Sequence, residues 1–515
     1  MPGPVGVRAE MRFPQWVVLL LIMFLAVALR VEDVGQSLWL DELHTGWVVI
    51  DGFSHLAERA AMGNYGPLYF CLPWLSVQVL GANELALRLP SLLASVALVP
   101  AIYLAVRSWC RSTEAALLAA TLVAVDPFCV VFGQEARVYA LLQLIALLHA
   151  MLCWQLAWTP SAGKRVAWVI LGATLFHLHY LTGLMLCGEL VFLASLTRGK
   201  SIGSKNRLRD LLLDVTCLVI LILPAWGSLA GIAARRVNWE WFVPRPSVWS
   251  AFTIFPFQVY VLLPATLVVV CYLANRYFHS LTAGFHPRQV WFVICWLVIP
   301  LSLGWILSVT DIARVFWPRY FMCSYSALFL FTGTCCAMLA RRSFQRCFAA
   351  LVILVSLVTY GPVGQLYLEG RLVGHKGENW RAALEWLNER SGEPATALLL
   401  HSGLIEEAEL DSHASQELVR YCLFPIASFY PLDRSVTSRI PLSASTVDRL
   451  EASTRELLIQ SESIFMLFRG SVEQAEVMLR QVTESLQPTE YFIDERVFLE
   501  GLVAVKIKRN RISQR

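Results

Sequence analysis

The sequence predicts a mainly α-helical protein that crosses a membrane many times and carries a C-terminal α/β domain outside the bilayer. Of its 515 residues, 57% are hydrophobic and only 16% are charged, whereas a soluble chain carries roughly 25% charged residues. Long apolar runs recur through the first three quarters of the chain, and each approaches the roughly 17–25 residues that a helix needs to cross the hydrocarbon. Beyond about residue 370, shorter apolar bursts separated by charged residues replace them.

Apolar runs that alternate with charged breaks predict about eleven membrane spans. The first run follows Arg8 and Arg12 and lacks a signal-peptide cleavage site, so we expect an uncleaved signal-anchor. The fifth and sixth runs are short and nearly fused, which leaves the count open by one or two. The expected spans lie near residues 15–31, 86–106, 115–132, 138–158, 166–178, 181–197, 211–231, 252–274, 290–309, 320–340 and 347–367.

The distribution of lysine predicts which loops face the cytoplasm. Every lysine before residue 370 lies in one alternating set of breaks, at Lys164, Lys200 and Lys205. Because cytoplasmic loops are enriched in Lys and Arg, this pattern places the N-terminus in the cytoplasm and the C-terminal segment outside. We therefore expect a multi-pass protein of the cell (inner or plasma) membrane. The net charge of +4 and the lack of a basic cluster argue against a nucleic-acid partner.

The loops expected on the outer side hold arginine but no lysine. The first is long, about residues 32–85, and its short amphipathic stretches are typical of helices that lie along a membrane surface. Short outer loops then carry Arg137 and Arg319. A guanidinium forms a planar fork that matches phosphate oxygens, so a bound anion is one explanation for these arginines. The other is a salt bridge to a nearby acidic side chain or a lipid headgroup.

The domain boundary is expected near residue 370, with a transmembrane domain over residues 1–369 and a soluble extracytoplasmic α/β domain over residues 370–515. The second domain combines strand-length apolar bursts with amphipathic helices. It contains no Gly-rich phosphate loop. The 13 cysteines of the chain are scattered and show no zinc spacing, so we expect them to pack helices. The expected elements are helices over 375–390 and 472–486, strands over 395–401 and 463–469, and a hairpin over 491–508.

Several short motifs fall on the expected outer side of the membrane. Their order along the chain resembles that of the membrane glycosyltransferases of the GT-C fold. The branch resembled holds protein O-mannosyltransferases and the aminoarabinose transferases of lipid A. One departure is that Tyr65-Gly66 stands where these enzymes commonly have His-Pro before Pro-Leu-Tyr. The motifs are Ser37-Leu-Trp-Leu-Asp41-Glu42, Asn64-Tyr-Gly-Pro67-Leu-Tyr69, Glu84-Leu-Ala-Leu-Arg88, Gln134-Glu135-Ala-Arg137-Val-Tyr139, His177-Leu-His179-Tyr180, Pro318-Arg319-Tyr320 and Glu378-Asn-Trp380-Arg381.

The resemblance implies a hexosyl- or pentosyltransferase, similar to mannosyltransferases. The donor would be a sugar on a polyprenyl phosphate, moved with inversion at the outer membrane face to a lipid, glycan or protein acceptor. Asp41 would act as the general base that takes the acceptor proton. Glu42 would shape the site beside it, and Glu135 would be a second carboxylate that either orients the sugar or acceptor or pairs with Arg137. The leaving phosphate requires stabilisation of its charge rather than a general acid.

The remaining expected site residues bind substrate. Arg137 and Arg319 are candidates for the phosphate, and Arg88 is a weaker one because an arginine at a span end can also snorkel. The others are His179, Tyr180 and Tyr69, the last of which could equally belong to an interfacial aromatic belt. His177 and His179 lack a third ligand nearby, so we predict no metal, although a divalent ion stays open. No cofactor is identified.

A multispan transporter or flippase of a lipid-linked or sugar substrate is the main alternative. Transporters usually show charges within spans or paired broken helices in corresponding halves. In this sequence the charges gather in the outer loops and the two halves do not look alike. A non-catalytic membrane scaffold is a further alternative, and it would tolerate loss of Asp41.

Overall fold

The computed structural model divides into two units, which are described separately. The helical unit comprises Met1–Val34, Asn64–Tyr69 and Arg88–Gly374, and the α/β unit comprises Gly35–Gly63, Phe70–Leu87 and His375–Arg515. Much of the first expected outer loop therefore belongs with the C-terminal residues. The described residues are 13–197, 204–234, 236, 243–278, 287–374, 377–391, 396–411, 415–432, 436–443, 452–486 and 491–509.

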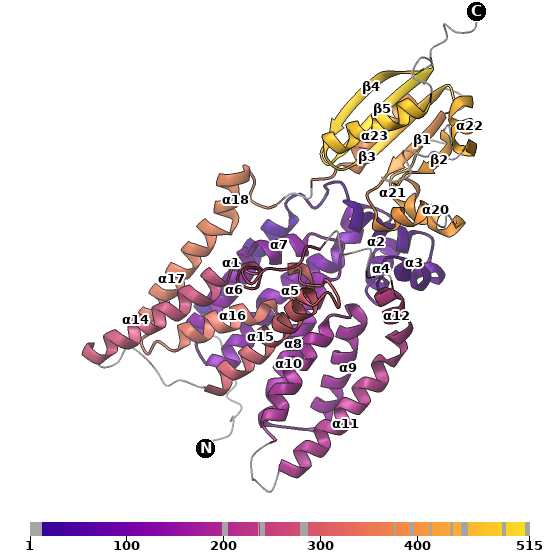
Figure 1. Cartoon of the computed structure of the whole chain (residues 1–515). Helices are drawn as coiled ribbons and strands as arrows, with labels where there is room; N and C mark the ends of the chain where they lie inside the picture. Colours follow the sequence, from indigo (N-terminus) through magenta and orange to yellow (C-terminus); the bar gives the residue numbers. More distant parts are fainter. Residues whose placement is uncertain are drawn as a thin grey trace, which may run out of the picture. The chain divides into compact units, whose positions relative to one another are not determined.

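Long apolar helices build the helical unit (Figure 1). Every expected span coincides with one helix or with a run of shorter helices separated by brief breaks. The elements are α1 (Phe13–Val31), α5 (Glu84–Cys110), α6 (Thr113–Val125), α7 (Pro127–Gly133), α8 (Tyr139–Trp158), α9 (Ala162–Leu178), α10 (Thr182–Ser195), α11 (Ser204–Ile222), η2 (Leu223–Ala225), α12 (Trp226–Ala234), α13 (Ser250–Thr253), η4 (Gln258–Leu262), α14 (Leu263–Phe278), α15 (Pro287–Val309), η5 (Pro318–Phe321), α16 (Met322–Ala337), α17 (Arg342–Thr359) and α18 (Pro362–Glu369).

The structure supports several membrane crossings without fixing their total. Among the described residues, six helices are long and apolar enough to cross a membrane, or up to seven if the bent pair α6 and α7 forms one span. The total of about eleven spans therefore stays a prediction. Shorter apolar helical stretches of 10–17 residues cover Gln15–Val31, Cys71–Leu80, Thr182–Ser195 and Gln258–Ala274.

Small residues let the helices of this unit pack closely. A Cβ atom added at Gly188 of α10 would lie 2.1 Å from the carbonyl oxygen of Cys295 in α15. One added at Gly333 of α16 would lie 2.9 Å from a methyl group of Val106 in α5. Lipid tails are as apolar as leucine, so membrane helices gain stability from such close packing rather than from the hydrophobic effect.

The α/β unit contains one mixed five-stranded sheet in the order β2-β1-β3-β5-β4. Strand β1 pairs in parallel with β2 and β3, and β5 pairs antiparallel with β3 and β4. The expected helix over 472–486, the strands near 395–401 and 463–469, and the hairpin are confirmed. The elements are α19 (Trp380–Arg390), β1 (Thr396–His401), η6 (Ile405–Asp411), α20 (Gln416–Cys422), α21 (Phe424–Ala427), β2 (Val436–Pro441), α22 (Ala452–Gln460), β3 (Ser463–Arg469), α23 (Val472–Ser485), β4 (Tyr491–Leu499) and β5 (Leu502–Arg509).

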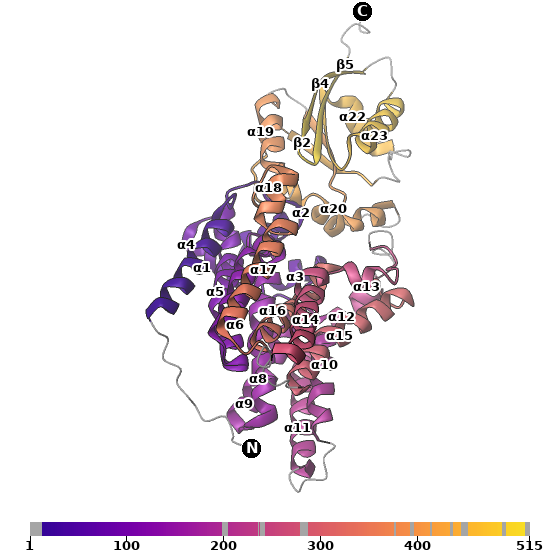
Figure 2. The same ribbon diagram turned by 90° about the vertical axis from the view of Figure 1, so that its left-hand side faces the viewer.

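Helices cover both faces of this sheet, with α22 and α23 on one side and α19 on the other (Figure 2). The alternation of side chains along the strands explains the two layers. Ile464 and Met466 of β3 belong to the core that includes Leu458 of α22 and Met478 of α23. Phe465 points to the opposite face, where Trp386 of α19 meets its ring edge-on with the centroids 5.9 Å apart.

The first expected outer loop contributes short helices to the α/β unit. These are α2 (Leu40–Ile50), η1 (Phe53–His55), α3 (Leu56–Met62) and α4 (Cys71–Leu80). Helix α2 packs against α21 through aromatic rings, and the centroids of His44 and Trp47 lie 5.7 and 5.8 Å from that of Phe424. A Cβ atom at Gly63 would lie 2.3 Å from Nε2 of His44, so the chain after α3 also passes close to this cluster.

Candidate functional site

A break between α6 and α7 sets the direction of the segment that carries Glu135 and Arg137. The two helices are bent by 55°. Pro127 begins α7 and has no N–H for the carbonyl group of Val123, which explains why α6 ends here. Asp126 caps α7, because its Oδ1 atom accepts from the N–H of Cys129 at 2.9 Å.

Arg30 satisfies the carbonyl groups that the break leaves open. Its guanidinium donates to the oxygens of Val123 and Ala124, both at 2.9 Å. Its Nε atom donates to the Ser95 hydroxyl at 2.6 Å, and Ser95 in turn donates to the carbonyl of Cys129 at 2.8 Å. Arg30 is fully buried. It therefore joins α1 and α5 to both halves of the broken helix.

Gln134 fixes the start of the motif that follows α7. Its side-chain amide donates to the carbonyl oxygens of Leu29 and Glu32, at 3.1 and 2.6 Å, near the C-terminal end of α1. Glu135 is buried, and its carbonyl oxygen accepts from the N–H of Arg137 at 2.7 Å in a tight turn. The motif is thus held by its backbone and by Gln134.

Arg137 stacks on Tyr65. Its guanidinium carbon lies 4.6 Å from the centroid of the Tyr65 ring, and the guanidinium donates to the Tyr65 hydroxyl. The hydroxyl groups of Tyr65 and Tyr139 lie 3.5 Å apart. The carbonyl of Arg137 accepts from Ser91 at 2.7 Å. Arg137 is only 4% exposed, so its charge is buried against the Tyr65 ring.

His179 lies in the same cluster as Arg137 and Arg319. The centroid of its ring lies 6.1 Å from that of Tyr139 and 5.5 Å from that of Tyr320. Burial lowers the pKa of His179 to about 3, and the charges of Arg319 and Arg137 add to this effect. The imidazole is therefore neutral at physiological pH. Its Nδ1 atom has no hydrogen-bond partner among the residues that the structure describes.

Arg319 lies in the helical turn η5, which directly precedes α16. Its guanidinium carbon lies 5.3 Å from the centroid of Tyr320, the ring that packs on His179. Since Arg137 and Arg319 both act on His179, the structure brings the two predicted phosphate-binding arginines to one cluster. We call Tyr65, Arg137, Tyr139, His179, Arg319 and Tyr320 the arginine–histidine cluster.

The helical unit also contains the predicted binding residues Tyr69 and Tyr180. Tyr69 is buried, and its hydroxyl lies 3.3 Å from that of Ser91, which holds Arg137. A Cβ atom at Gly66 would lie 2.8 Å from the carbonyl oxygen of His177 in α9 and 3.4 Å from the hydroxyl of Tyr180. The absence of a side chain at Gly66 thus allows the 64–69 segment to approach α9.

Arg88 and His177 have structural contacts of their own. The guanidinium of Arg88 donates to the carbonyl of Val34 at 2.7 Å, and the residue is only 1% exposed. The Nε2 atom of His177 lies 2.9 Å from the carbonyl oxygen of Leu221, near the end of α11. Among the described residues, no group of three or more His, Cys, Asp and Glu side chains could hold a metal ion.

Asp41 and Glu42 lie in the first turn of α2, within the α/β unit. Glu42 is fully buried, and its Oε2 atom accepts from the N–H of Trp39 at 3.4 Å, which caps the helix. Asp41 is only partly buried. Of the pair, Asp41 therefore has the more accessible carboxylate, as a proton acceptor requires.

Sequence reasoning missed Arg30, Ser91 and Ser95 and did not assign Tyr139 or Tyr320 to the site. Tyr139 and Tyr320 belong to motifs that the sequence had already singled out, so their spacing from Arg137 and Arg319 was an available signal. For Arg30 the available signal was its position at the end of the first apolar run. An arginine there lies either at the membrane interface or, as the structure shows, buried with hydrogen-bond partners.

Comparisons with known proteins agree on the fold. Residues 64–227 match the family model described as dolichyl-phosphate-mannose-protein mannosyltransferase. The structure is similar to that of ArnT from Cupriavidus metallidurans in the apo state, with a TM-score of 0.52 and 15% identity over 96% of this chain and 97% of that one. The same enzyme bound to undecaprenyl phosphate matches with a TM-score of 0.51, again at 15% identity and over 96% and 97% of the two chains.

The likeness to ArnT confirms the expected GT-C fold with a C-terminal domain that contains a small β-sheet. No curated protein sequence matches the chain. The family match begins at Asn64 and covers the segments that supply Tyr65, Arg137 and His179, and it ends before Arg319. Most of the arginine–histidine cluster therefore lies inside the matched region.

Proposed function

We propose that this protein is a glycosyltransferase that moves a sugar from a polyprenyl-phosphate donor to an acceptor outside the cytoplasm, with inversion in a single displacement. The observation that carries the proposal is the arginine–histidine cluster, which gathers two cationic groups and a neutral histidine among tyrosines in the helical unit. The GT-C fold and the match to a mannosyltransferase family model support the same activity. ArnT, which shares this fold, has been solved with undecaprenyl phosphate.

Arg137 and Arg319 would stabilise the phosphate that leaves the sugar. A polyprenyl phosphate is already a weak base, so its departure requires positive charge rather than a proton donor. Arginine suits this role because its fork can donate two parallel hydrogen bonds to phosphate oxygens. The low exposure of Arg137 limits competition from water, which strengthens the interaction.

His179 would contact the substrate as a neutral group. A neutral imidazole can accept a hydrogen bond at one ring nitrogen and donate from the other. Its buried Nδ1 atom lacks a protein partner in the described part of the chain, which supports a bound hydroxyl or phosphate oxygen as its partner. Tyr180 and Tyr69, beside the cluster, stay proposed substrate contacts.

Asp41 is the proposed general base, with Glu42 and Glu135 as supporting carboxylates. An inverting transfer requires one group that removes the proton from the acceptor hydroxyl or amine, and a positioned carboxylate can do so. Glu42 caps α2 and so supports Asp41 through the helix. The acceptor is proposed as a lipid, glycan or protein, and the C-terminal segment is proposed to lie outside the cytoplasm.

A transfer assay in membranes tests the proposal, with radiolabelled polyprenyl-phosphate sugars as donors and Asp41→Asn as the variant. The substitution keeps the size of the side chain and removes the base, so we expect kcat to fall roughly 10²- to 10⁴-fold with little change in the KM for the donor. Asp33→Asn, outside the proposed site, serves as the matched control. Full activity of Asp41→Asn would exclude Asp41 as the base, and no transfer from any donor would count against the activity itself.

A further inference from the structure

Residues 35–40, which lead directly into Asp41, are hydrogen-bonded to residues near the other end of the chain. The N–H of Leu38 donates to the hydroxyl of Tyr430 at 2.8 Å. The N–H of Leu40 donates to Oε2 of Glu378 at 2.9 Å. All of these residues belong to the α/β unit. The C-terminal part of that unit therefore binds the backbone at the N-terminus of α2.

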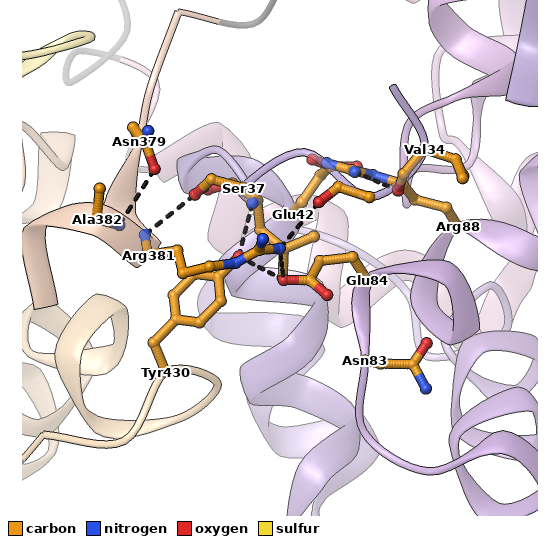
Figure 3. Close-up of polar contacts among 12 residues, drawn as sticks. Val34, Ser37, Glu42, Asn83, Glu84, Arg88, Asn379, Arg381, Ala382 and Tyr430 are labelled. Carbon is orange, nitrogen blue, oxygen red and sulfur yellow. Dashed lines mark hydrogen bonds and ion pairs between the residues drawn. The ribbon is translucent and has the colours of Figure 1, made fainter. Parts of the chain in front are cut away.

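Arg381 adds further contacts to the same segment (Figure 3). Its N–H donates to the Ser37 hydroxyl at 3.2 Å, and its guanidinium donates to the carbonyl oxygen of Gly35 at 2.9 Å. The guanidinium also forms an ion pair with Glu84, which accepts from the hydroxyl of Tyr430 at 3.1 Å. The segment before Asp41 is thus held from several directions.

Glu378 is the most firmly fixed of these partners. Its Oε1 atom accepts from Nε and Nη2 of Arg469, at the end of β3, at 2.8 and 2.7 Å. Its Oε2 atom accepts from the indole N–H of Trp380 at 2.8 Å in addition to the N–H of Leu40. Only 8% of Glu378 is exposed. A buried carboxylate at a helix N-terminus is stabilised by the helix dipole.

The backbone around Glu378 is fixed by the turn between β4 and β5. The N–H of Asn379 donates to the carbonyl of Glu500 at 2.9 Å. A Cβ atom at Gly501 would lie 2.1 Å from the carbonyl oxygen of Gly377 and 3.1 Å from Cγ of Glu378. Gly377 and Gly501 both have positive φ values, of +69° and +68°, which glycine adopts readily. Close backbone packing therefore sets the position of the carboxylate.

We propose that Glu378 is a positioning residue for the reaction and that the C-terminal sheet, through Arg469 and Glu378, holds Asp41 in place. The inference rests on the proposed role of Asp41 as the base. The first N–H groups of a helix have no partner within the helix. Glu378 supplies one for Leu40, the residue directly before Asp41. A base must lie within hydrogen-bond reach of the acceptor proton, so a loose first turn of α2 would slow the reaction.

Hydrogen–deuterium exchange of the full-length protein in detergent tests the clamp itself. In Glu378→Ala we expect the amides of residues 38–42 to exchange at least about tenfold faster than in the wild type, because the fixed partner of Leu40 is lost. Glu385→Ala is the matched control, since Glu385 is exposed on the adjacent helix α19. Unchanged exchange in Glu378→Ala would overturn the inference, whatever the role of Asp41.

A double-mutant cycle in the transfer assay tests whether Glu378 acts through Asp41. Glu378→Ala should lower kcat roughly 10- to 100-fold and leave the KM for the donor nearly unchanged. In the Asp41→Asn background the same change should cost no further activity, because the positioned group is already gone. If the double variant loses kcat by the product of the two single-variant losses, the inference is overturned. Full activity of Asp41→Asn would instead refute the role of Asp41 as the base. The exchange experiment would still show separately whether Glu378 holds the start of α2.

A milder variant covers the case in which Glu378→Ala does not fold. Tyr430→Phe removes one hydroxyl, which binds both Leu38 and Glu84, and keeps the ring in place. We expect a smaller increase in exchange over residues 38–42 and a smaller loss of kcat, both in the same direction as for Glu378→Ala. A variant that folds and shows neither effect would count against the clamp.

Discussion

The burial of His179 makes the stability of the helical unit depend on pH. Burial and two arginine charges lower its pKa to about 3, whereas an unfolded histidine titrates near 6.5. Between these values the unfolded chain binds a proton that the folded chain does not. The contribution to stability is therefore complete above about pH 6.5 and falls as the pH decreases toward 3, by up to roughly 1.4 kcal/mol per pH unit.

We expect the thermal unfolding midpoint of the purified protein to fall more between pH 7 and pH 5 in the wild type than in His179→Gln. Glutamine does not titrate, so its contribution stays constant over this range. The measurement is thermal unfolding in detergent at both pH values. His177→Gln is the control, because the His177 ring is hydrogen-bonded to the Leu221 carbonyl and has no contact with either cluster arginine in the described part of the chain. An equal fall in wild type and His179→Gln would contradict the assigned pKa.

Replacing either cluster arginine with lysine should weaken donor binding. Lysine keeps the charge but loses the planar fork and the stacking on tyrosine. For Arg137→Lys and Arg319→Lys we expect the KM for the donor to rise about 10- to 100-fold, the equivalent of a charge-assisted hydrogen bond. Arg314→Lys is the matched control, since Arg314 pairs with Asp311 in the same expected outer loop. An unchanged KM would indicate that the arginines have a purely structural role.

The sequence predicted these arginines as phosphate-binding residues because the outer loops hold arginine but no lysine. The order of the motifs along the chain supported the same prediction. The sequence could not predict that Tyr65 stacks on Arg137, because 72 residues separate them and only the packing of the helices brings them together. It also missed that Glu42 and Arg88 are buried in structural contacts, since burial depends on neighbours from distant parts of the chain.

At the scale of elements, Arg30 is expected to stabilise the break between α6 and α7. Arg30→Met would leave the carbonyl groups of Val123 and Ala124 without donors, at a cost of about 1–3 kcal/mol each. We expect a clear decrease in the thermal unfolding midpoint in detergent, and a smaller decrease for Arg30→Lys, which can still donate. Arg346→Met is the control, because Arg346 is exposed and forms one peripheral ion pair. Equal stability of Arg30→Met and the wild type would rule out this role.

The helices were predictable at this scale because an apolar run long enough for a membrane has few alternatives to a helix. The strands of the hairpin β4–β5 were predictable from their alternation. Strand β2 was not expected, because Val436–Pro441 is a polar edge strand that ends in proline. The bend at Asp126 and Pro127 was also missed, since the apolar run continues through it.

For the whole molecule, the orientation in the membrane is the prediction to test. A phosphatase that folds only outside the cytoplasm should be active when it is fused after Arg515 and inactive when it is fused after Lys164. The physical reason is the excess of lysine in one set of loops, because loops rich in lysine and arginine stay on the cytoplasmic side. Enzyme activity of cells that express each fusion is the measurement. The reverse pattern would contradict the predicted topology.

The hydrogen bonds that hold the segment before Asp41 have a consequence for biosynthesis. They join residues that are 338 and 392 positions apart in the chain. A ribosome releases the N-terminal partner long before it has made the other, and contacts of such long range form late in folding. The nascent chain can therefore insert its helices one after another while the Asp41 segment lacks its final support. The proposed base therefore gains its support only after the chain has been made beyond Tyr430.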